Sequence, residues 1–264
     1  MAATVSVTEQ LTRTRQMITR KYHANKYIAY FQNYTNTFLP PDRFRSYLME
    51  ATRIPGVVEI SVSTRPDCVS AEYLDIMRDI RAMTGIQMNV ELGLQTANYH
   101  TLQMIDRGHG LAEFIDAVLR IKSYTGISIC THVILNLPGD TAADAKETAR
   151  ILTALGVDIV KLHSLYIARN TRLCDWYENG KITVCSKEEY FERVITFLEQ
   201  IPETVAVERM FSRIPEKDAV FCNWGCSWWR LRDELLQKME EEGRYQGRCC
   251  DYLNGAALCL LKSE

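Results

Sequence analysis

Strand-like and helix-like patterns alternate along the first 165 residues, and this alternation constrains the fold more than any other feature. Short runs rich in aliphatic and aromatic residues predict buried strands at Lys26–Gln32, Val57–Ser63, Met88–Leu94, Ile127–Leu135 and Val157–Leu165. Helical patterns precede and separate them at 5–22, 40–52, 70–83, 111–124 and 141–155. Strands joined by single helices form parallel βαβ units, so we predict an α/β protein with a parallel sheet.

The sheet is expected to be barrel-like rather than doubly wound. The connections are short, and the pattern shows no point at which the strand order would reverse. Five strands cannot close an eight-stranded barrel, so the prediction is a partial TIM-type barrel. Because the chain starts with a helical pattern, any preceding strand would lie upstream of Met1.

The alternation ends after Leu165, and the rest of the chain is expected to form an accessory region. A helical pattern covers 186–200, a strand-like run covers 203–208, and a charged helical pattern covers 227–242. We expect residues 1–200 to form the barrel core and 201–264 a C-terminal region packed on it. That region carries three tryptophans and many aliphatic side chains, whose exposure to water would cost several kcal/mol at about 25 cal/mol per Å².

Composition excludes several classes of protein. With 47% hydrophobic and 24% charged residues the chain is typical of soluble globular proteins, and its net charge of −2 excludes a strongly basic nucleic-acid coat. No apolar run reaches the length of a membrane span, and the start has no signal-peptide pattern. We therefore expect a cytoplasmic protein with no membrane partner, whose nine cysteines are mostly buried thiols.

Polar residues follow or interrupt the predicted strands at one edge of the sheet. Gln95 follows the third strand, Arg107 lies in the loop beyond it, and His132 lies within the fourth strand. Ligands of parallel barrels bind at the carboxyl edge, so we predict that these three line one cavity. Structural alternatives stay open: Gln95 could cap the sheet, Arg107 could form a surface ion pair, and His132 could be a core histidine.

Four motifs together resemble a known family. Ser63–Asp67 (STRPD), Glu91–Gln95 (ELGLQ), Asp106–His109 (DRGH) and Leu137–Asp140 (LPGD) occur in this order. The set is similar to the radical S-adenosylmethionine (radical SAM) enzymes, specifically the YhcC/YtqA subgroup, which shares its barrel and a C-terminal extension with the Elp3 tRNA-modifying enzymes. The segments Tyr30–Gln32, Tyr34–Thr37 and Arg244–Gly247 add to the likeness, which covers nearly the whole chain.

The resemblance implies a fold, a reaction and cofactors. The fold is a partial (β/α)6 barrel, and the cofactors are S-adenosylmethionine and a [4Fe–4S] cluster. The family reaction is reductive cleavage of S-adenosylmethionine to a 5′-deoxyadenosyl radical, with an electron donor such as flavodoxin or ferredoxin.

The resemblance also implies cofactor-binding residues. Gln95 matches a residue that contacts the cofactor's ribose, and Arg107 and His132 match positions that line the cofactor. Thr64 ends a strand that carries a ribose-binding carboxylate in the family. Ser63 stands at the glutamate position of this strand.

The cluster ligands are the main departure from the family. Family members hold the cluster with a Cys-x3-Cys-x2-Cys loop after the first strand, and no such triplet occurs in these 264 residues. We therefore expect the first strand and its loop to be missing from this chain. Cys222 and Cys226 have the first spacing, but Trp229 stands at the third position. A zinc site with Cys249 and Cys250 is the less favoured reading of these thiols, because the spacing is irregular.

Two function classes remain open. The first is an enzyme that modifies a substrate, with tRNA wobble uridine suggested by the Elp3-like resemblance alone. The second is a degenerate, non-catalytic barrel that binds a nucleotide or RNA without a cluster. A basic face of the first helix could meet a phosphate backbone or simply be solvated; its residues are Arg13, Arg15, Arg20, Lys21 and Lys26.

Overall fold

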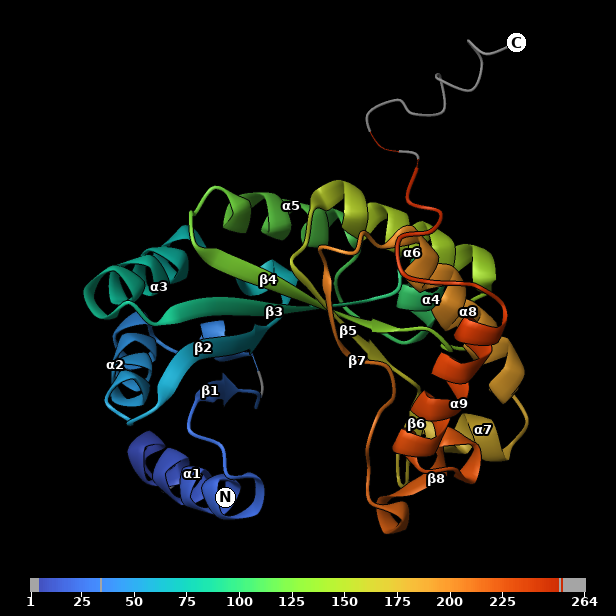
Figure 1. The fold of residues 1–264 in the computed structure, drawn as a ribbon, viewed down its shortest axis with the longest axis horizontal. Helices are drawn as coiled ribbons and strands as arrows, with labels where there is room; N and C mark the ends of the chain where they lie inside the picture. The colour runs from blue at the N-terminus through green and yellow to red at the C-terminus, as the bar shows by residue number, and fades with distance from the viewer. Residues whose placement is uncertain (1–4, 34, 252, 254–264) are drawn as a thin grey trace. The chain divides into compact units, whose positions relative to one another are not determined.

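The computed structural model describes residues 5–33, 35–251 and 253, and six strands form its main sheet. In the order β1-β2-β3-β4-β5-β7 these are β1 (Tyr27–Phe31), β2 (Val57–Thr64), β3 (Gln87–Gln95), β4 (Ile127–Ile134), β5 (Ile159–His163) and β7 (Ala206–Arg209) (Figure 1). The α/β class and the partial TIM-type barrel, with six strands rather than eight, are confirmed.

The predicted helices are present with ends close to those expected. They are α1 (Val7–Tyr22), α2 (Pro41–Thr52), α3 (Ala71–Thr84), α5 (Leu111–Lys122), α6 (Ala142–Leu155), α8 (Lys187–Gln200) and α9 (Trp228–Glu241). The short elements α4 (Tyr99–Met104), β6 (Tyr166–Ala168), α7 (Arg172–Glu178) and β8 (Ala219–Cys222) were not predicted, because so few residues show no periodicity. Within the described residues, no helix is long and apolar enough to cross a membrane.

The strand count differs from the sequence prediction. We counted five strands in an unbroken alternation, whereas β7 extends the sheet to six by pairing in parallel with β5, with Ala206 opposite Ile159. The strand-like run at 203–208 is therefore a member of the main sheet. The four residues of β7, three of which pair with β5, are mostly exposed, so their hydrophobic pattern alone could not show this pairing.

The chain divides into two compact units. The first unit comprises Met1–Gly93 and Ala112–Cys130, and the second comprises Leu94–Leu111 and Thr131–Glu264. In the first unit α2 packs against α1 and α3, over a core that includes Ile60, Leu74, Met88 and Phe114. In the second unit α6 packs against α8, and β6 pairs antiparallel with β8. The predicted domain division at residue 200 stays a prediction.

Local signals explain where several helices begin and end. At α6, the Thr141 backbone N–H and hydroxyl both bond to the Asp144 carboxylate at 2.7 Å, which makes a capping box. Gly85 ends α3 at φ +72°, in the left-handed region where glycine is favoured. Ser70 holds the N-cap position of α3 but makes no capping hydrogen bond with its side chain.

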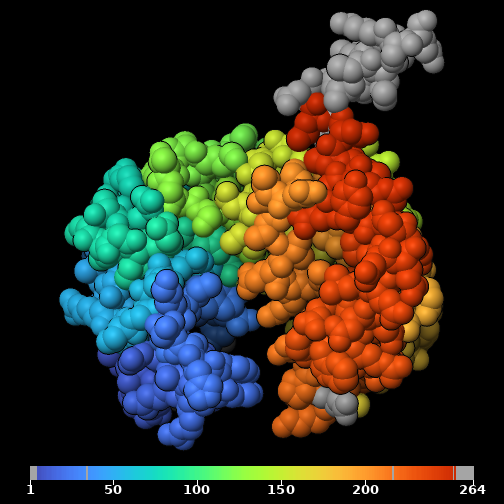
Figure 2. Space-filling model, viewed as in Figure 1, coloured from blue at the N-terminus to red at the C-terminus, as the bar shows by residue number. Residues whose placement is uncertain are grey.

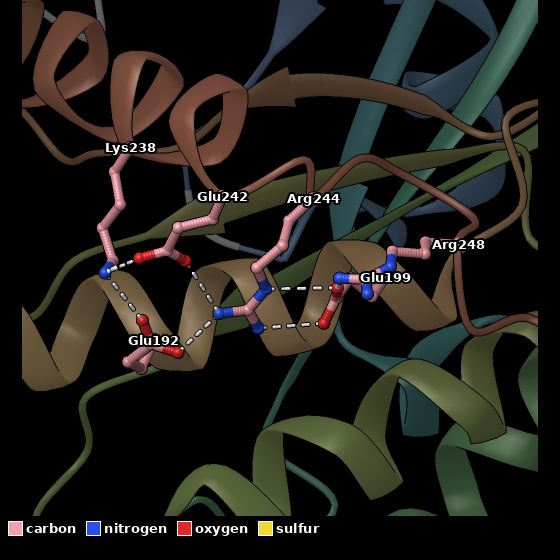
Figure 3. Close-up of polar contacts among 6 residues, drawn as sticks. All are labelled: Glu192, Glu199, Lys238, Glu242, Arg244 and Arg248. Atoms are coloured by element: carbon pink, nitrogen blue, oxygen red, sulfur yellow. Dashed lines mark hydrogen bonds and ion pairs between the residues drawn. The ribbon is translucent and has the colours of Figure 1, made fainter.

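The chain after α9 is fixed to α8 by a group of six charged residues that we call the Arg244 clamp (Figure 3). Its members are Glu192, Glu199, Lys238, Glu242, Arg244 and Arg248. Arg244 donates from Nε and Nη2 to the two oxygens of Glu199, at 3.1 and 2.9 Å, and from Nη1 to Glu192 at 2.7 Å. The backbone N–H of Cys249 also donates to the Glu199 carbonyl at 2.8 Å.

The clamp and α9 attach the described part of the C-terminal region to α8. Leu231 and Leu235 of α9 are fully buried, and Lys187 of α8 pairs with Glu234 of α9 at 2.9 Å. The contacts of the described part of this region with α8 extend to Cys249, and its packing on the barrel as a separate layer stays a prediction. Residues 254–264, which include Cys259, lie outside the described residues.

Candidate functional site

A cavity of about 450 Å³ lies in the second unit at the ends of β3, β4 and β5. We call it the strand-edge cavity. Its polar lining comes from Gln95, His132, His163 and Ser212, and its apolar lining includes Ile134 and Leu165. Its volume lies within the range of small-molecule sites, and its mixed lining suits a ligand with both an apolar ring and polar edges.

Gln95 reaches this cavity from a strained backbone position. It is the last residue of β3, and its φ of +74° lies in the left-handed region that side chains other than glycine rarely adopt. Such strain costs about 1–3 kcal/mol and is concentrated at functional sites. The turn ends the strand where the Gln95 side chain lines the cavity. Sequence alone gave no sign of this conformation.

Two histidines form a pair on the cavity wall. His163 Nε2 lies 3.2 Å from His132 Nδ1, and the rings are nearly parallel with centroids 5.1 Å apart. Ser212 Oγ lies 3.4 Å from His163 Nδ1. Which of the two ring nitrogens donates depends on the tautomer of each histidine.

Ser212 is held in place by a buried network from three segments. Its N–H donates to Ser164 Oγ at 2.9 Å, while Ser164 donates to Asn223 Oδ1 at 2.6 Å. Asn223 completes the ring by donating to the Ser212 carbonyl at 2.9 Å. All three residues are at least 95% buried, so the network fixes the cavity wall rigidly.

The motif Leu137–Asp140 has a structural role here. Asp140 is buried and accepts a hydrogen bond from Thr101 Oγ1 at 2.5 Å. Burial raises the pKa of Asp140, and hydrogen bonds from Thr101 and Thr96 partly offset that rise. The adjacent N-terminus of α6 already carries the Asp144 carboxylate of its own capping box, so it does not offer an open anion site.

The four predicted site residues separate into two groups. Gln95 and His132 line the same cavity, as expected from their strand positions. Arg107 is half-buried in the same unit, on the loop after α4, and is not among the residues lining this cavity. Thr64 lies in the first unit, where its hydroxyl is buried 2.5 Å from that of Thr37.

The first unit has its own buried polar cluster on β2 and β3. Ser61 donates to the Glu91 carboxylate at 2.7 Å, and Asn89 donates to Ser61 at 3.0 Å. Glu91 is 3% exposed. Burial raises the pKa of Tyr30, and the nearby Glu91 carboxylate raises it further. The signal for this cluster was present in the sequence as polar residues at alternate positions of two otherwise apolar strands.

The described cysteines do not form a four-thiolate zinc site, and no Cys-x3-Cys-x2-Cys triplet for an iron–sulfur cluster occurs in the sequence. Eight of the nine are free thiols in the described residues. In this part of the chain, no three of them bring their sulfur atoms together within 4.8 Å. Cys222, Cys226, Cys249 and Cys250 are each half-buried instead.

Two family models match the chain. The radical SAM superfamily matches residues 13–152, and the radical SAM C-terminal domain matches residues 157–241. Together they cover the residues that line the strand-edge cavity and the C-terminal region as far as residue 241.

Curated relatives align with most of the chain. The protein YtqA of Bacillus subtilis is 32% identical over 228 residues, which are 86% of this chain and 70% of YtqA. The protein YhcC of Escherichia coli K12 is 31% identical over 238 residues, covering 90% and 75% of the two chains. A tRNA uridine(34) acetyltransferase of Methanocaldococcus infernus is 28% identical over 162 residues, which are 60% of this chain and 29% of that protein.

The solved structure of archaeal Elp3 from Methanocaldococcus infernus has the same fold. It superposes with a TM-score of 0.74 at 19% sequence identity, over 90% of this chain and 60% of the Elp3 chain. This likeness confirms the partial-barrel architecture.

Proposed function

The chain belongs to the radical SAM superfamily, in the Elp3-related subgroup of YhcC and YtqA, and from this premise we propose that its strand-edge cavity binds S-adenosylmethionine. The observation that carries the proposal is the convergence of Gln95, His132 and His163 on one cavity of about 450 Å³. That volume and lining suit the adenosine part of the cofactor.

The lining residues have complementary roles in this proposal. The Gln95 amide can both donate to and accept from ribose hydroxyls. The His132–His163 pair lines the same cavity, and the tautomer of each ring decides whether it donates or accepts a hydrogen bond. Ile134 and Leu165 give an apolar surface for the adenine ring. Arg107 and Thr64 stay predictions that rest on the resemblance alone.

The cysteine pattern of the chain does not fit the cluster-binding loop of the family. Reductive cleavage of S-adenosylmethionine at a [4Fe–4S] cluster needs three convergent thiolates, and no Cys-x3-Cys-x2-Cys triplet occurs in these 264 residues. The electron donor, flavodoxin or ferredoxin, and a cytoplasmic location stay predictions as well.

We propose tRNA as the substrate class, with wobble uridine as the expected position. The support is the family membership together with a relative whose name is tRNA uridine(34) acetyltransferase. The second candidate is a non-catalytic module that binds a nucleotide or RNA, and the lack of a Cys-x3-Cys-x2-Cys triplet in these 264 residues supports it. Both candidates require the strand-edge cavity to bind the cofactor or a similar nucleoside.

Calorimetric titration of the purified chain with S-adenosylmethionine and S-adenosylhomocysteine tests the binding proposal. We expect binding by the wild type and about ten-fold weaker binding by Gln95→Ala, a loss of about 1.4 kcal/mol. Gln237→Ala is the matched control, since Gln237 is exposed on α9 and bonds only within its own helix at 2.8 Å. Absence of binding by the wild type, or equal affinity of Gln95→Ala, would disprove the proposal.

Anaerobic reconstitution with iron and sulfide separates the two function classes. We expect the 264-residue chain to stay colourless and to yield no 5′-deoxyadenosine, whereas a version extended by the sequence encoded upstream and carrying a Cys-x3-Cys-x2-Cys loop should yield it. A brown, active 264-residue chain would contradict this expectation, and Cys222, Cys226 and Cys249 would then be the first residues to replace.

A further inference from the structure

An aromatic pocket with an arginine at its side lies in the second unit between β8 and the start of α9. We call it the Trp228 pocket. It has a volume of about 580 Å³, and the side chains that define its character are Arg213, Phe221, Trp224 and Trp228. Ser212 lines both this pocket and the strand-edge cavity, so the two share one wall residue.

The pocket is bordered by a stacked cation and ring. The Arg213 guanidinium carbon lies 3.7 Å from the centroid of the Trp228 ring, and that of Arg232 lies 5.6 Å from it. A neighbouring cavity of about 420 Å³ is lined by Arg213 and Trp228 as well, together with Arg209 and Arg232. In Figure 2 the orange surface around β7 and the orange-red surface of α9, which supply these residues, lie side by side.

One wall of the Trp228 pocket is preorganised. Trp224 donates from Nε1 to the Cys185 carbonyl at 2.8 Å and meets the Phe221 ring edge to face at 5.7 Å. Its φ of +51° turns the backbone sharply at this point. Because the ring is fixed before any ligand arrives, stacking on it costs little side-chain entropy.

The charge around the two cavities favours an anion. Among the described side chains that line the two cavities, the one carboxylate is that of Glu208, which pairs with Lys161 at 3.1 Å. Arg232 pairs with Asp233 at 2.6 Å. Among the described side chains, Arg209 and Arg213 have no carboxylate partner, and both are exposed. Two unneutralised guanidinium groups therefore lie beside an aromatic pocket.

We propose that the Trp228 pocket binds one nucleotide of a single-stranded RNA segment, with its base against the aromatic walls and its phosphate on Arg209 and Arg213. Aromatic faces and guanidinium planes stack on any base, and arginines bind phosphate in a fork geometry, so this pair of features suits single-stranded nucleic acid. The choice of RNA over another polyanion rests on the proposed function. The shared residue Ser212 places the bound nucleotide next to the strand-edge cavity.

The test is fluorescence anisotropy with a fluorescein-labelled, uridine-rich 12-nucleotide RNA and the whole chain. We expect Arg213→Gln to weaken binding and to lower the slope of log affinity against log salt by about 0.7, the value for one lost phosphate contact on a single strand. Trp228→Leu should weaken binding about ten-fold, because an aromatic wall is lost and the Arg213 guanidinium loses the ring on which it stacks. The matched control is Arg43→Gln on α2, which removes another exposed arginine that has no carboxylate partner among the described side chains.

Three outcomes would overturn this inference. They are no RNA binding by the wild type at low salt, unchanged binding by Arg213→Gln, and competition by free uridine monophosphate at the same concentration as the RNA. The third result would assign the pocket to a free nucleotide. Arg213→Gln keeps the test decisive if Trp228→Leu does not fold.

The same variants separate this inference from the proposed function. Titration of Arg213→Gln with S-adenosylhomocysteine should give wild-type affinity, since Arg213 does not line the strand-edge cavity. If the chain binds RNA but not the cofactor, the RNA-binding inference stands and the proposal of cofactor binding at the strand-edge cavity fails. If the chain binds the cofactor but not RNA, the cofactor-binding proposal stands and the RNA-binding inference fails.

Discussion

The Arg244 clamp and the strand-edge cavity are both polar groups of the second unit, but they use their hydrogen-bonding capacity differently. In the clamp, Arg244 donates to Glu199, Glu192 and Glu242 (Figure 3). In the strand-edge cavity, Gln95 and two histidines line a volume of about 450 Å³. The comparison teaches that charges paired within the chain stabilise the fold, whereas polar side chains that line a cavity can also contact a ligand.

The largest expected effect is on stability, from Arg244→Ala. The Arg244 and Glu199 side chains are 17% and 10% exposed, so removing the arginine leaves a nearly buried carboxylate without its bidentate partner. We expect the free energy of unfolding to fall by about 3 kcal/mol, measured by urea denaturation. The free energy of unfolding of Arg244→Lys should lie between those of the wild type and Arg244→Ala. Lysine keeps the positive charge but cannot bond to both carboxylate oxygens as the arginine guanidinium does. Cofactor affinity should not change, and a parallel loss of affinity would erase the distinction between the two regions.

The second prediction reverses the sign of the stability effect at the cavity. Gln95→Gly removes the side chain from a residue at φ +74°, so backbone strain is relieved while the ligand contact is lost. We expect the free energy of unfolding to rise by about 0.5–1 kcal/mol, since the relief outweighs the extra freedom of the unfolded chain. Affinity for S-adenosylhomocysteine should fall about ten-fold, or about 1.4 kcal/mol. A destabilised variant with intact affinity would assign Gln95 a purely structural role.

The third prediction uses opposite pH dependences of two carboxyl groups. Burial by itself raises the pKa of Glu192, but hydrogen bonds from Arg244 and Lys238 outweigh it and hold that pKa below its usual range. The stability that Glu192 contributes is therefore present above the unfolded value of about 4.3 and is lost as pH falls through the lowered folded pKa. Burial raises the pKa of Asp140, so on acidification the folded chain binds a proton at this carboxyl group at a higher pH than the unfolded chain does. The free energy of unfolding therefore increases as the pH falls through the folded pKa towards the unfolded value of about 3.9.

Urea denaturation from pH 7 to pH 3 checks both signs. The stability advantage of the wild type over Glu192→Gln should shrink below about pH 4.3. The stability of the wild type relative to Asp140→Asn should instead increase as the pH approaches about 3.9. If both differences move in the same direction, the assigned environments of these two groups are wrong.

The smallest expected effect is that of Arg248→Ala, at the edge of the clamp. Arg248 makes one bond to Glu199 at 3.1 Å, and its side chain is 45% exposed. Solvent screens such a pair, so we expect unfolding to become easier by about 0.5 kcal/mol or less. Urea denaturation of Arg248→Ala and Arg244→Ala side by side shows how much of the stability from the clamp depends on burial of the ion pair. If Arg248→Ala loses as much stability as Arg244→Ala, burial is not what makes the Arg244–Glu199 pair strong.

Much of the fold followed from local sequence patterns. The alternation of apolar runs with helical stripes gave β1 to β5 and the seven longer helices nearly to their ends, because strand and helix periodicity are properties of short segments. The capping box at Thr141 and the glycine end of α3 were also readable, since each involves residues within one or two turns.

Residue order and motif also placed Gln95 and His132 at one edge of the sheet, and the cavity contains both. Only the tertiary structure decided which partners they have. His163 is 31 residues beyond His132, and Ser212 is 49 residues beyond His163, so no local pattern could show that these side chains meet. The left-handed turn at Gln95 is likewise imposed by its surroundings, because nothing in an isolated ELGLQ segment favours a positive φ there.

The sequence by itself determined the strand-and-helix order and the kinds of chemical groups at the ends of the strands. It did not determine the addition of β7 to the sheet, the separation of the described thiols or the closing of the Arg244 clamp across 45 residues. These features arise from contacts between distant segments. Such contacts form only when burial of apolar surface outweighs the entropy of closing the intervening loops, and that balance is set by the packing of the whole chain.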